Sequence, residues 1–413
     1  MSFVNRFKNS AHYMLSFLKW GLLGILMGVI GGLLGAVFFH ALKFVTQLRQ
    51  DNNWLIYLLP IGGIVTIGIY RLFKLQSNRG TNEVIESVLQ DRRVSSLITP
   101  AIFTSTAITH LLGGSAGREG AALQMGGSVA SLLCEALRLK KKDRTILIMC
   151  GMTAVFAGVF GTPLTACFFT MEFESVGTIF SPALFPCIVS ALVASKLSLY
   201  LGVHGETGIQ INTVLFTLDN SWKIVVLAIS ISVIGIIMCY LFHKAEHLAH
   251  EWIKNPLLRI VIGSAVIIGL TLLVGDQRFN GAGMEMALGA LEGNADWYSF
   301  ILKMLFTAIT LAAGFKGGEI VPTFCIGATF GCVMGILLGL DPTVAAALGL
   351  IGLFACTTNS PLASIVLSME MFGGANLPVF ALVCVITFVL SGPSKLYASQ
   401  LMRFPKLSLE QDK

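Results

Sequence analysis

The segment "GGSAGREGAALQMGG" at residues 113–127 places Arg118 and Glu119 side by side among glycines, between two apolar runs. An ionisable residue inside a membrane span is costly and is by default a functional-site hypothesis. The glycines let the backbone approach an ion closely, and a helix predicted to start at Ala121 would point its free amides at that ion. The segment therefore predicts an anion site, which Glu119 occupies when ionised and vacates when protonated.

A second segment, "GGEIVP" at residues 317–322, repeats this arrangement. Glu319 precedes a helix predicted to start near Val321, and Pro322 suits the first helical turn. A second intramembrane carboxylate facing the first suggests a proton relay. The alternative is a carboxylate that merely caps the helix.

Two further groups could contribute to the same site. "RGTNEVIESVL" at residues 79–89 offers a Gly80-Thr81-Asn82 turn entering a helix, with backbone amides, a hydroxyl and an amide group. Such turns also cap ordinary helices. Arg118 either raises the local positive potential or anchors its loop, and the sequence leaves both roles open.

Composition places these motifs in a membrane. Only 12% of the 413 residues are charged, against about 25% in soluble domains, and the mean hydropathy is +0.79. The first residues, 1–21, lack a secretory cleavage pattern and predict an interfacial amphipathic helix leading into the first span. Apolar runs of about 20 residues or more, sufficient to cross a bilayer, are clearest at 15–42, 54–73, 180–202, 222–242, 256–274 and 375–391.

The net charge of +6 is spread over short basic clusters beside the spans, which are typical of cytoplasmic loops. Both termini are therefore predicted to be cytoplasmic, and nucleic acid is not an expected partner. The nine cysteines lie in apolar segments without CxxC spacing, which predicts small buried side chains. The basic residues are Arg71, Lys74, Arg79, Arg92, Arg93, those of "RLKKKDR" at 138–144, Arg6, Lys8, Arg403 and Lys406.

The chain contains an internal repeat. "GMTAVFAGVFGTPLTACFFTMEF" at 151–173 aligns with "GLIGLFACTTNSPLASIVLSMEMF" at 349–372, and "TAITHLLGGSAGREG" at 106–120 resembles "TAITLAAGFKGGEIVP" at 307–322. The aligned pairs include Gly151 with Gly349, Phe156 with Phe354, Pro163 with Pro361 and Glu172 with Glu370. The order is the same in both halves, so the sequence predicts a duplicated membrane domain.

Short apolar segments broken by Gly or Pro occur at corresponding places in the two halves. This pattern predicts discontinuous helices whose N-termini meet near the bilayer midplane, where their partial positive charge suits an anion. The alternative is that Gly and Pro are simply common in membrane helices. The segments are 120–136, 162–172, 320–338 and 361–371.

These motifs, together with a late "SGPSKLYASQ" at 391–400, resemble the CLC family of anion channels and proton-coupled antiporters over nearly the whole chain. The resemblance implies an all-α polytopic membrane protein with two inverted-topology repeats, at about 15–205 and 215–405, in a single transmembrane domain spanning 1–413. It implies a homodimer in a bacterial cell membrane with one anion pathway per subunit. No soluble regulatory domain, cofactor or metal is expected.

By the same resemblance, Glu119 matches the external gating glutamate and Tyr397 the tyrosine that closes the inner side of the pathway. Gly80, Thr81 and Asn82 fall on the motif that carries the inner anion-coordinating residue. The expected gating and proton-transfer residues are thus Glu119 and Glu319. The expected anion-binding residues are Gly80, Thr81, Asn82, Arg118, Gly120, Ala121, Ile320, Val321 and Tyr397.

Departures from the chloride/proton members favour one subfamily. Those members carry a second glutamate directly after the position of Glu172, where this chain has Phe173, and an apolar residue at the position of Glu319. The missing glutamate at position 173 and the additional Glu319 resemble the fluoride-exporting CLC subfamily. In that subfamily, the glutamate at the position of Glu319 is implicated in proton coupling. The predicted function is a proton-coupled antiporter exporting fluoride. Glu172 and Glu370 are predicted to have capping or interfacial roles.

Several alternatives remain. A chloride/proton antiporter stays open because Val321 is apolar where the fluoride subfamily is expected to carry a hydroxyl residue. A passive anion channel would also keep Glu119, but it gains nothing from Glu319.

"GGSAG" matches the G-x-S-x-G pattern of serine hydrolases formally, yet no strand accompanies Ser115. "HKAEHLAHE" at 243–251 has a spacing that can bind zinc, although it also suits a helix end at the interface.

Overall fold

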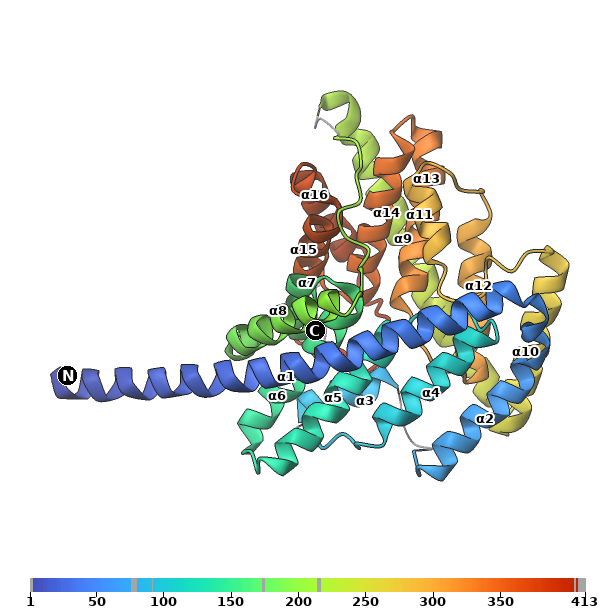
Figure 1. The fold of residues 1–413 in the computed structure, drawn as a ribbon. Helices are drawn as coiled ribbons and strands as arrows, with labels where there is room; N and C mark the ends of the chain where they lie inside the picture. The colour runs from blue at the N-terminus through green and yellow to red at the C-terminus, as the bar shows by residue number, and fades with distance from the viewer. Residues whose placement is uncertain are drawn as a thin grey trace, which may run out of the picture.

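The computed structural model describes residues 3–75, 80–90, 92–172, 175–213, 217–404 and 406–407, without the side chains of 3–12 and 218. Phe173 and Arg79 lie outside the described residues, and so do the side chains of Arg6 and Lys8. The described chain is almost entirely α-helical (Figure 1).

The first half is built from eight α-helices, two short 3-10 helices and one short strand. In chain order they are α1 (Phe3–Asp51), η1 (Asn53–Leu58), α2 (Leu59–Leu72), α3 (Thr81–Gln90), α4 (Ile98–Leu111), α5 (Glu119–Ala136), α6 (Lys141–Phe160), α7 (Pro163–Glu172), β1 (Ser175–Val176), η2 (Ser181–Ala183) and α8 (Leu184–Tyr200).

The second half continues with α-helices and closes with a strand that pairs in parallel with β1, Ser175 opposite Leu401. Its elements are α9 (Leu218–Trp252), α10 (Pro256–Val274), α11 (Met284–Leu291), α12 (Ser299–Ala313), α13 (Ile320–Leu338), α14 (Pro342–Thr358), α15 (Pro361–Phe372), α16 (Leu377–Leu390) and β2 (Leu401–Met402).

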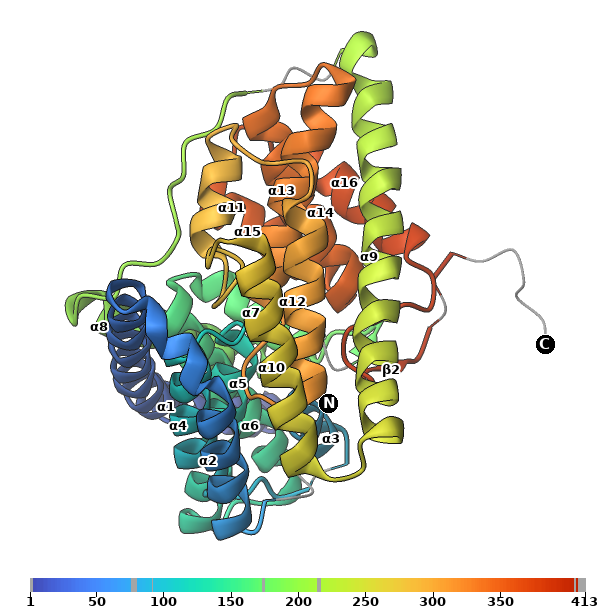
Figure 2. The ribbon, with the colours of Figure 1, turned by 90° about the vertical axis from the view of Figure 1, so that its right-hand side faces the viewer.

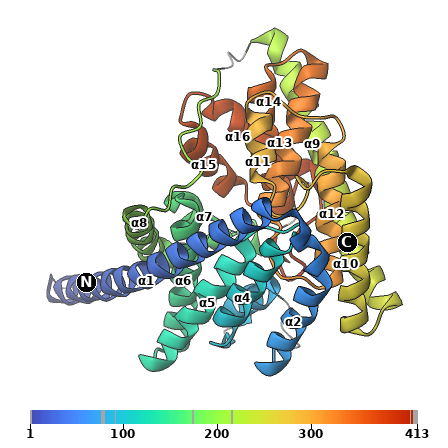
Figure 3. The ribbon, with the colours of Figure 1, turned by 45° about the vertical axis from the view of Figure 1, so that its right-hand side comes forward.

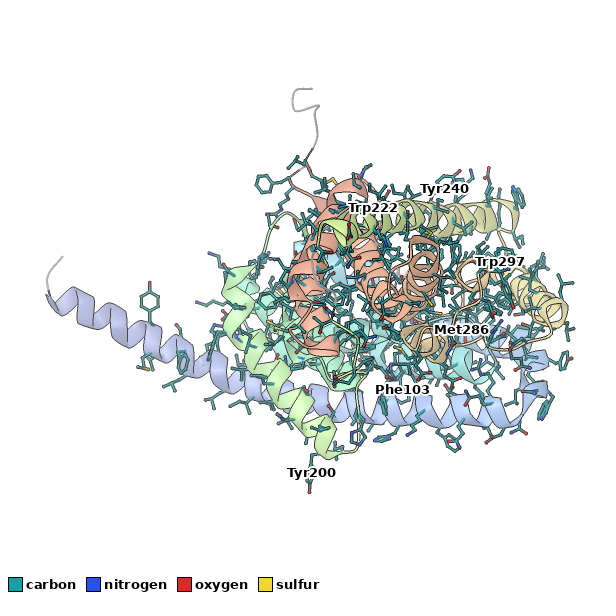
Figure 4. The ribbon with its side chains drawn as sticks, turned by 90° about the horizontal axis from the view of Figure 1, so that it is seen from above. Phe103, Tyr200, Trp222, Tyr240, Met286 and Trp297 are labelled. Atoms are coloured by element: carbon teal, nitrogen blue, oxygen red, sulfur yellow. The ribbon has the colours of Figure 1, made fainter. Side chains whose placement is uncertain are left out.

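The two halves occupy different regions of the molecule. In Figure 1, α2 to α6 lie in the lower part and α13 to α16 in the upper part, while Figure 2 shows α9 running along one edge for most of the height. Seven helices of the described chain are long and apolar enough to cross a membrane. Large aromatic side chains point outward at the periphery (Figure 4), as expected of a lipid-facing surface. Those labelled are Tyr200, Trp222, Tyr240 and Trp297, which are 86%, 56%, 66% and 69% exposed.

The predicted discontinuous helices are confirmed, and the two repeats break their helices by the same chemistry. After α6, Gly161 adopts a left-handed conformation with φ 72°, and Pro163 starts α7. After α14, Asn359 adopts φ 57°, and Pro361 starts α15. A left-handed residue ends a helix, and a proline suits the first turn of the next because its missing N–H has no helical partner there.

Small residues bring the helices of each repeat close together. A Cβ on Gly126 of α5 would lie 2.2 Å from the carbonyl oxygen of Gly151 on α6. At the corresponding place in the second half, a Cβ on Gly327 of α13 would lie 2.4 Å from the carbonyl oxygen of Gly349 on α14. Such backbone contact between membrane helices requires glycine, so the motif helices α5 and α13 are held rigidly against their neighbours.

The two halves also cap each other's short helices. The Glu370 carboxylate at the end of α15 accepts hydrogen bonds from the backbone N–H of Leu164 and of Thr165, both 2.9 Å, at the start of α7. The Glu172 carboxylate at the end of α7 accepts from the N–H of Leu362 (3.2 Å) and of Ala363 (2.9 Å) in α15. The predicted capping role of both glutamates is confirmed, and each carboxylate satisfies amides that a helix start leaves without partners.

The structure also tests the predictions made for the N-terminal helix, the cysteines and Lys406. Helix α1 runs unbroken from Phe3 to Asp51, so no break separates an interfacial helix from the first span, and its N-terminal part projects beyond the other helices (Figure 3). The nine cysteines are free and buried, as predicted. Lys406, grouped with the basic terminal residues, is instead buried and donates to the Ser391 hydroxyl at 2.5 Å, because its long chain packs inward over the Phe388 ring.

Replacing Glu370 with alanine should lower the free energy of unfolding by about 2 kcal/mol, because a charged acceptor of three hydrogen bonds is lost. Glu370→Gln keeps one acceptor oxygen and should lose less. Thermal unfolding of the detergent-solubilised protein measures the difference. The exposed Glu292→Ala serves as the control, and equal stability of Glu370→Ala and this control would contradict the reciprocal capping.

Candidate functional site

The loops that precede α5 and α13 are joined by an isolated antiparallel bridge. The Gly117 N–H donates to the Gly318 carbonyl oxygen at 2.6 Å, and the Gly318 N–H donates to the Gly117 carbonyl oxygen at 2.8 Å. The N-termini of α5 and α13 therefore meet, one from each half of the chain, as the repeat pattern predicts. Their free N–H groups and helix dipoles converge on one small region.

Glu119 lies at this meeting point. Its side chain is completely buried, and among the described residues its carboxylate makes no well-aligned hydrogen bond. The backbone N–H groups of Arg118, Glu119 and Val321 nevertheless lie close enough to interact with it. A Cβ on Gly117 would lie 2.2 Å from Glu119 Oε2, and a Cβ on Gly318 would lie 2.6 Å from it. Gly318 has to be glycine, because a Cβ there would also lie 2.7 Å from the Gly120 backbone nitrogen. A buried carboxylate without a well-aligned donor is an expensive arrangement, which makes Glu119 a candidate functional group.

The Gly80-Thr81-Asn82 turn approaches the start of α5 from the side. A Cβ on Gly120 would lie 2.7 Å from Thr81 Oγ1, so the hydroxyl lies directly against the α5 backbone. The Asn82 Oδ1 accepts a hydrogen bond from the Ser399 N–H at 2.9 Å, which ties this turn to the segment that carries Tyr397.

These groups border a cavity of about 640 Å³. Tyr397 is buried, whereas Glu319 is half-buried and lines the same cavity, and its carboxylate makes no capping hydrogen bond to α13. The alternative of a capping role for Glu319 is thus not what the structure shows. Of the residues predicted from the sequence, the cavity is lined by Gly80, Thr81, Asn82, Glu319 and Tyr397.

The remaining predicted residues surround the bridge. Gly120, Ala121, Ile320 and Val321 are buried in the first turns of α5 and α13. Both helices start slightly earlier than expected, at Glu119 instead of Ala121 and at Ile320 instead of near Val321. The reason is that Arg118 and Glu319 already take helix-like backbone angles at the two N-caps. Glu119 therefore belongs to the first turn of α5 instead of preceding it.

Arg118 points away from the large cavity. Its guanidinium lies over the rings of Phe39 and Phe160, 5.0 Å from each centroid. Cation–π contacts of this kind stabilise a cation by about 0.5–2 kcal/mol, so the structure gives Arg118 the contacts of a loop anchor. Its contribution to the potential at the anion site stays a prediction.

Two residues that the sequence analysis did not single out belong to this region. Gln124 lines the cavity, and its Nε2 donates to the Gly120 carbonyl oxygen at 3.1 Å. Lys303 of α12 is completely buried and donates to the Ser115 hydroxyl at 3.0 Å and to the carbonyl oxygens of Phe279 at 3.1 Å and Gly281 at 2.7 Å. A lone lysine within the apolar segment 299–313 was the available signal.

The Lys303 contacts also bear on the G-x-S-x-G match at Ser115. The Ser115 hydroxyl is buried and bonded to Lys303 and to the Thr307 hydroxyl (2.9 Å). His110 lies 3.4 Å from the Gly117 carbonyl oxygen through Nε2. Ser115 therefore holds the loop in place on α12, and the G-x-S-x-G match does not form a nucleophile elbow.

Two of the three histidines of "HKAEHLAHE" have local partners. His247 lies 3.5 Å from the Glu251 carboxylate and His250 lies 3.2 Å from the Arg259 guanidinium. Within the described part of the chain, no group of three or more His, Cys, Asp or Glu side chains is placed to hold a metal ion. The interface-end interpretation of this motif therefore agrees with the structure.

Sequence comparison identifies the family. The family model described as voltage gated chloride channel matches residues 62–392. The chain belongs to the CLC family. Members of this family are anion channels and transporters, and the CLC architecture explains why the N-termini of α5 and α13 meet.

Individual CLC proteins resemble this chain over most of its length. A chloride/fluoride channel protein of Pseudomonas syringae pv. tomato is 32% identical, with 92% of this chain and 86% of that protein covered. The H(+)/Cl(-) exchange transporter ClcA of Vibrio campbellii is 27% identical, with 94% and 89% covered.

Solved CLC structures superpose on the fold. The crystal structure of a CLC-type fluoride/proton antiporter has a TM-score of 0.90 and 32% identity, covering 93% of this chain and 98% of that chain. The structure of a slow cyanobacterial Cl-/H+ antiporter has a TM-score of 0.78 and 21% identity, covering 90% and 94%, and shows the shared fold.

Replacing Lys303 with methionine should destabilise the protein by about 2 kcal/mol or more, because the buried carbonyl oxygens of Phe279 and Gly281 lose their donor and the Ser115 hydroxyl loses one of two partners. Methionine keeps the length of the side chain, so loss of packing does not explain the effect. Lys196→Met, at an exposed position of α8, is the control. Thermal unfolding in detergent measures both variants, and an unchanged midpoint for Lys303→Met would contradict the anchoring role.

Proposed function

We propose that this protein is a proton-coupled anion antiporter that exports fluoride. The observation that carries the proposal is Glu119, a buried carboxylate at the meeting N-termini of α5 and α13, where the N–H groups of both helix starts surround it. Helix N-termini bind anions, so an anion and the Glu119 carboxylate compete for one position. Protonation of Glu119 releases that position, and this exchange links proton uptake to anion passage.

Glu319 supports proton coupling over a passive channel. It directly follows Gly318, which contacts Glu119 Oε2, and it lines the large cavity. A proton that leaves Glu119 can therefore be accepted by the Glu319 carboxylate on the side of the cavity. A passive anion pathway gains nothing from a second carboxylate, because its charge repels the conducted ion. The Phe173 position, which would hold a different second glutamate in chloride/proton members, lies outside the described residues.

The choice of fluoride rests on relatives. The names of two similar proteins, at 32% identity each, mention fluoride. Chloride/proton exchange is the alternative on substrate, because the Vibrio campbellii relative is a chloride exchanger. The proposed anion-binding groups are the first-turn amides of α5 and α13, the Gly80-Thr81-Asn82 turn and Tyr397.

The setting of this activity is also part of the proposal. The protein is proposed to be a homodimer with one pathway in each subunit, in the plasma membrane of a bacterial cell. Both termini would face the cytoplasm, on the side of the exposed basic residues Arg92, Arg93 and Arg403. Lys406 does not contribute to this argument, because it is buried.

Proteoliposomes loaded with fluoride, with external fluoride and pH recorded together, test the proposal. Fluoride efflux should drive protons in the opposite direction, and the pH signal should reverse when the fluoride gradient is reversed. Chloride gradients should drive less exchange. Fluoride movement without a proton signal would contradict antiport and support a channel.

Glutamine substitutions should separate the roles of the glutamates. Glu119→Gln and Glu319→Gln should reduce proton movement to the level of empty vesicles, because glutamine keeps the shape and cannot exchange a proton. With Glu119→Gln the fluoride flux becomes uncoupled or stops. Glu172→Gln is the matched control, since this residue caps α15 and should leave coupling intact. Normal coupling in Glu319→Gln, or its loss in Glu172→Gln, would contradict the assignment.

A further inference from the structure

The large cavity extends from the buried Tyr397 to exposed residues on α9. Glu246 and His250 line it from α9, Arg259 lines it from α10, and Lys316 lines it from the loop before α13. Since Glu246 and His250 are exposed and Tyr397 is buried, the cavity leads from the protein surface into the interior. Glu319 lies on this route.

Glu246 differs from the other carboxylate at the end of α9. Glu251 forms an ion pair with His247, whereas the Glu246 carboxylate forms no hydrogen bond or ion pair with any described residue. Glu246 interacts electrostatically with the cations Lys316 and Arg259 and with Glu319. It is therefore an exposed acid within electrostatic range of the proposed relay residue.

The cations around Glu246 are held by other groups. Lys316 lies over the Tyr70 ring, with its Nζ 4.7 Å from the centroid. Arg259 lies 3.2 Å from His250 Nδ1 and donates to the Ile253 carbonyl oxygen at 3.3 Å. These contacts position both cations beside the cavity without neutralising Glu246 through a direct ion pair. The titratable and charged groups that share the cavity with Glu246 are Tyr70 and Arg71 of α2, His250 of α9, Arg259 of α10, Lys316, Glu319 and Tyr397.

We infer that Glu246 exchanges protons between the water at the outer end of the cavity and Glu319. This inference rests on the proposed antiport and extends its proton path by one group. Glu246 and Glu319 are the two carboxylates among the cavity-lining residues. Arginine holds its proton too tightly to pass it on at neutral pH, Lys316 lies over the Tyr70 ring, and His250 Nδ1 faces the Arg259 guanidinium.

The step transfers one proton and breaks no bond other than O–H. A hydronium ion at the outer end of the cavity donates its proton to the Glu246 carboxylate and becomes water. The proton then passes along the cavity to the Glu319 carboxylate, which leaves Glu246 ionised again. The neighbouring cations Lys316 and Arg259 favour the ionised form of Glu246 and attract anions to the same cavity. Protons and anions thereby share one entrance.

The test compares Glu246→Gln with the matched control Glu251→Gln, which alters a carboxylate on the same helix outside the cavity. In proteoliposomes with a fluoride gradient, Glu246→Gln should slow coupled exchange at least about tenfold at neutral and alkaline pH. The effect should shrink at acid pH, where protons reach Glu319 directly. Glu246→Asp should restore most of the rate, and the control should behave as wild type.

Four outcomes separate this role from others. Calorimetric titration with fluoride should give Glu246→Gln the affinity of the wild type, which shows that the site is intact. A wild-type rate and pH profile in Glu246→Gln would overturn the inference while leaving the antiport proposal standing. A loss of rate equal in Glu246→Asp and Glu246→Gln would overturn it as well. A wild-type protein that moves fluoride without protons refutes the antiport itself.

Discussion

The bridge between Gly117 and Gly318 determines how close the N-termini of α5 and α13 can come, and the rest of the site depends on that distance. A Cβ on either glycine would take space from the Glu119 carboxylate, and a Cβ on Gly318 would also collide with the Gly120 backbone nitrogen. The carboxylate is therefore confined between two helix starts. Their amides and dipoles favour negative charge, while burial away from water opposes it. A group under both influences is suited to exchange places with an anion.

Contacts between the halves hold this arrangement in place. Glu172 and Glu370 cap the start of the short helix in the opposite half, and Lys303 fixes the loop of Ser115 to α12. These structural charges are fully engaged by partners. Glu119 makes no well-aligned hydrogen bond among the described residues, and Glu319 makes no capping bond to α13. This difference in hydrogen bonding supports the proposal that Glu119 and Glu319 are the functional glutamates and that Glu172 and Glu370 are structural.

The helix breaks and the candidate glutamates could be predicted from the sequence, because neighbouring residues along the chain determine them. The helix breaks follow from Gly161 and Pro163 and from their counterparts Asn359 and Pro361. The glycine-flanked Glu119 and Glu319 stand out in apolar surroundings. Long-range partners were not predictable: Glu370 contacts Thr165 across the two halves, and Glu246 reaches the Glu319 cavity only through the packing of α9. No local pattern encodes such contacts.

The central claim is that Glu119 and the anion compete for one site, and calorimetric titration of fluoride at several pH values tests it most directly. Wild-type affinity should rise as pH falls, by up to about tenfold per pH unit, because a proton must neutralise Glu119 before the anion takes its place. In Glu119→Gln the affinity should be nearly independent of pH and at least as high as that of the wild type at low pH. The same pH dependence in both proteins would contradict the claim.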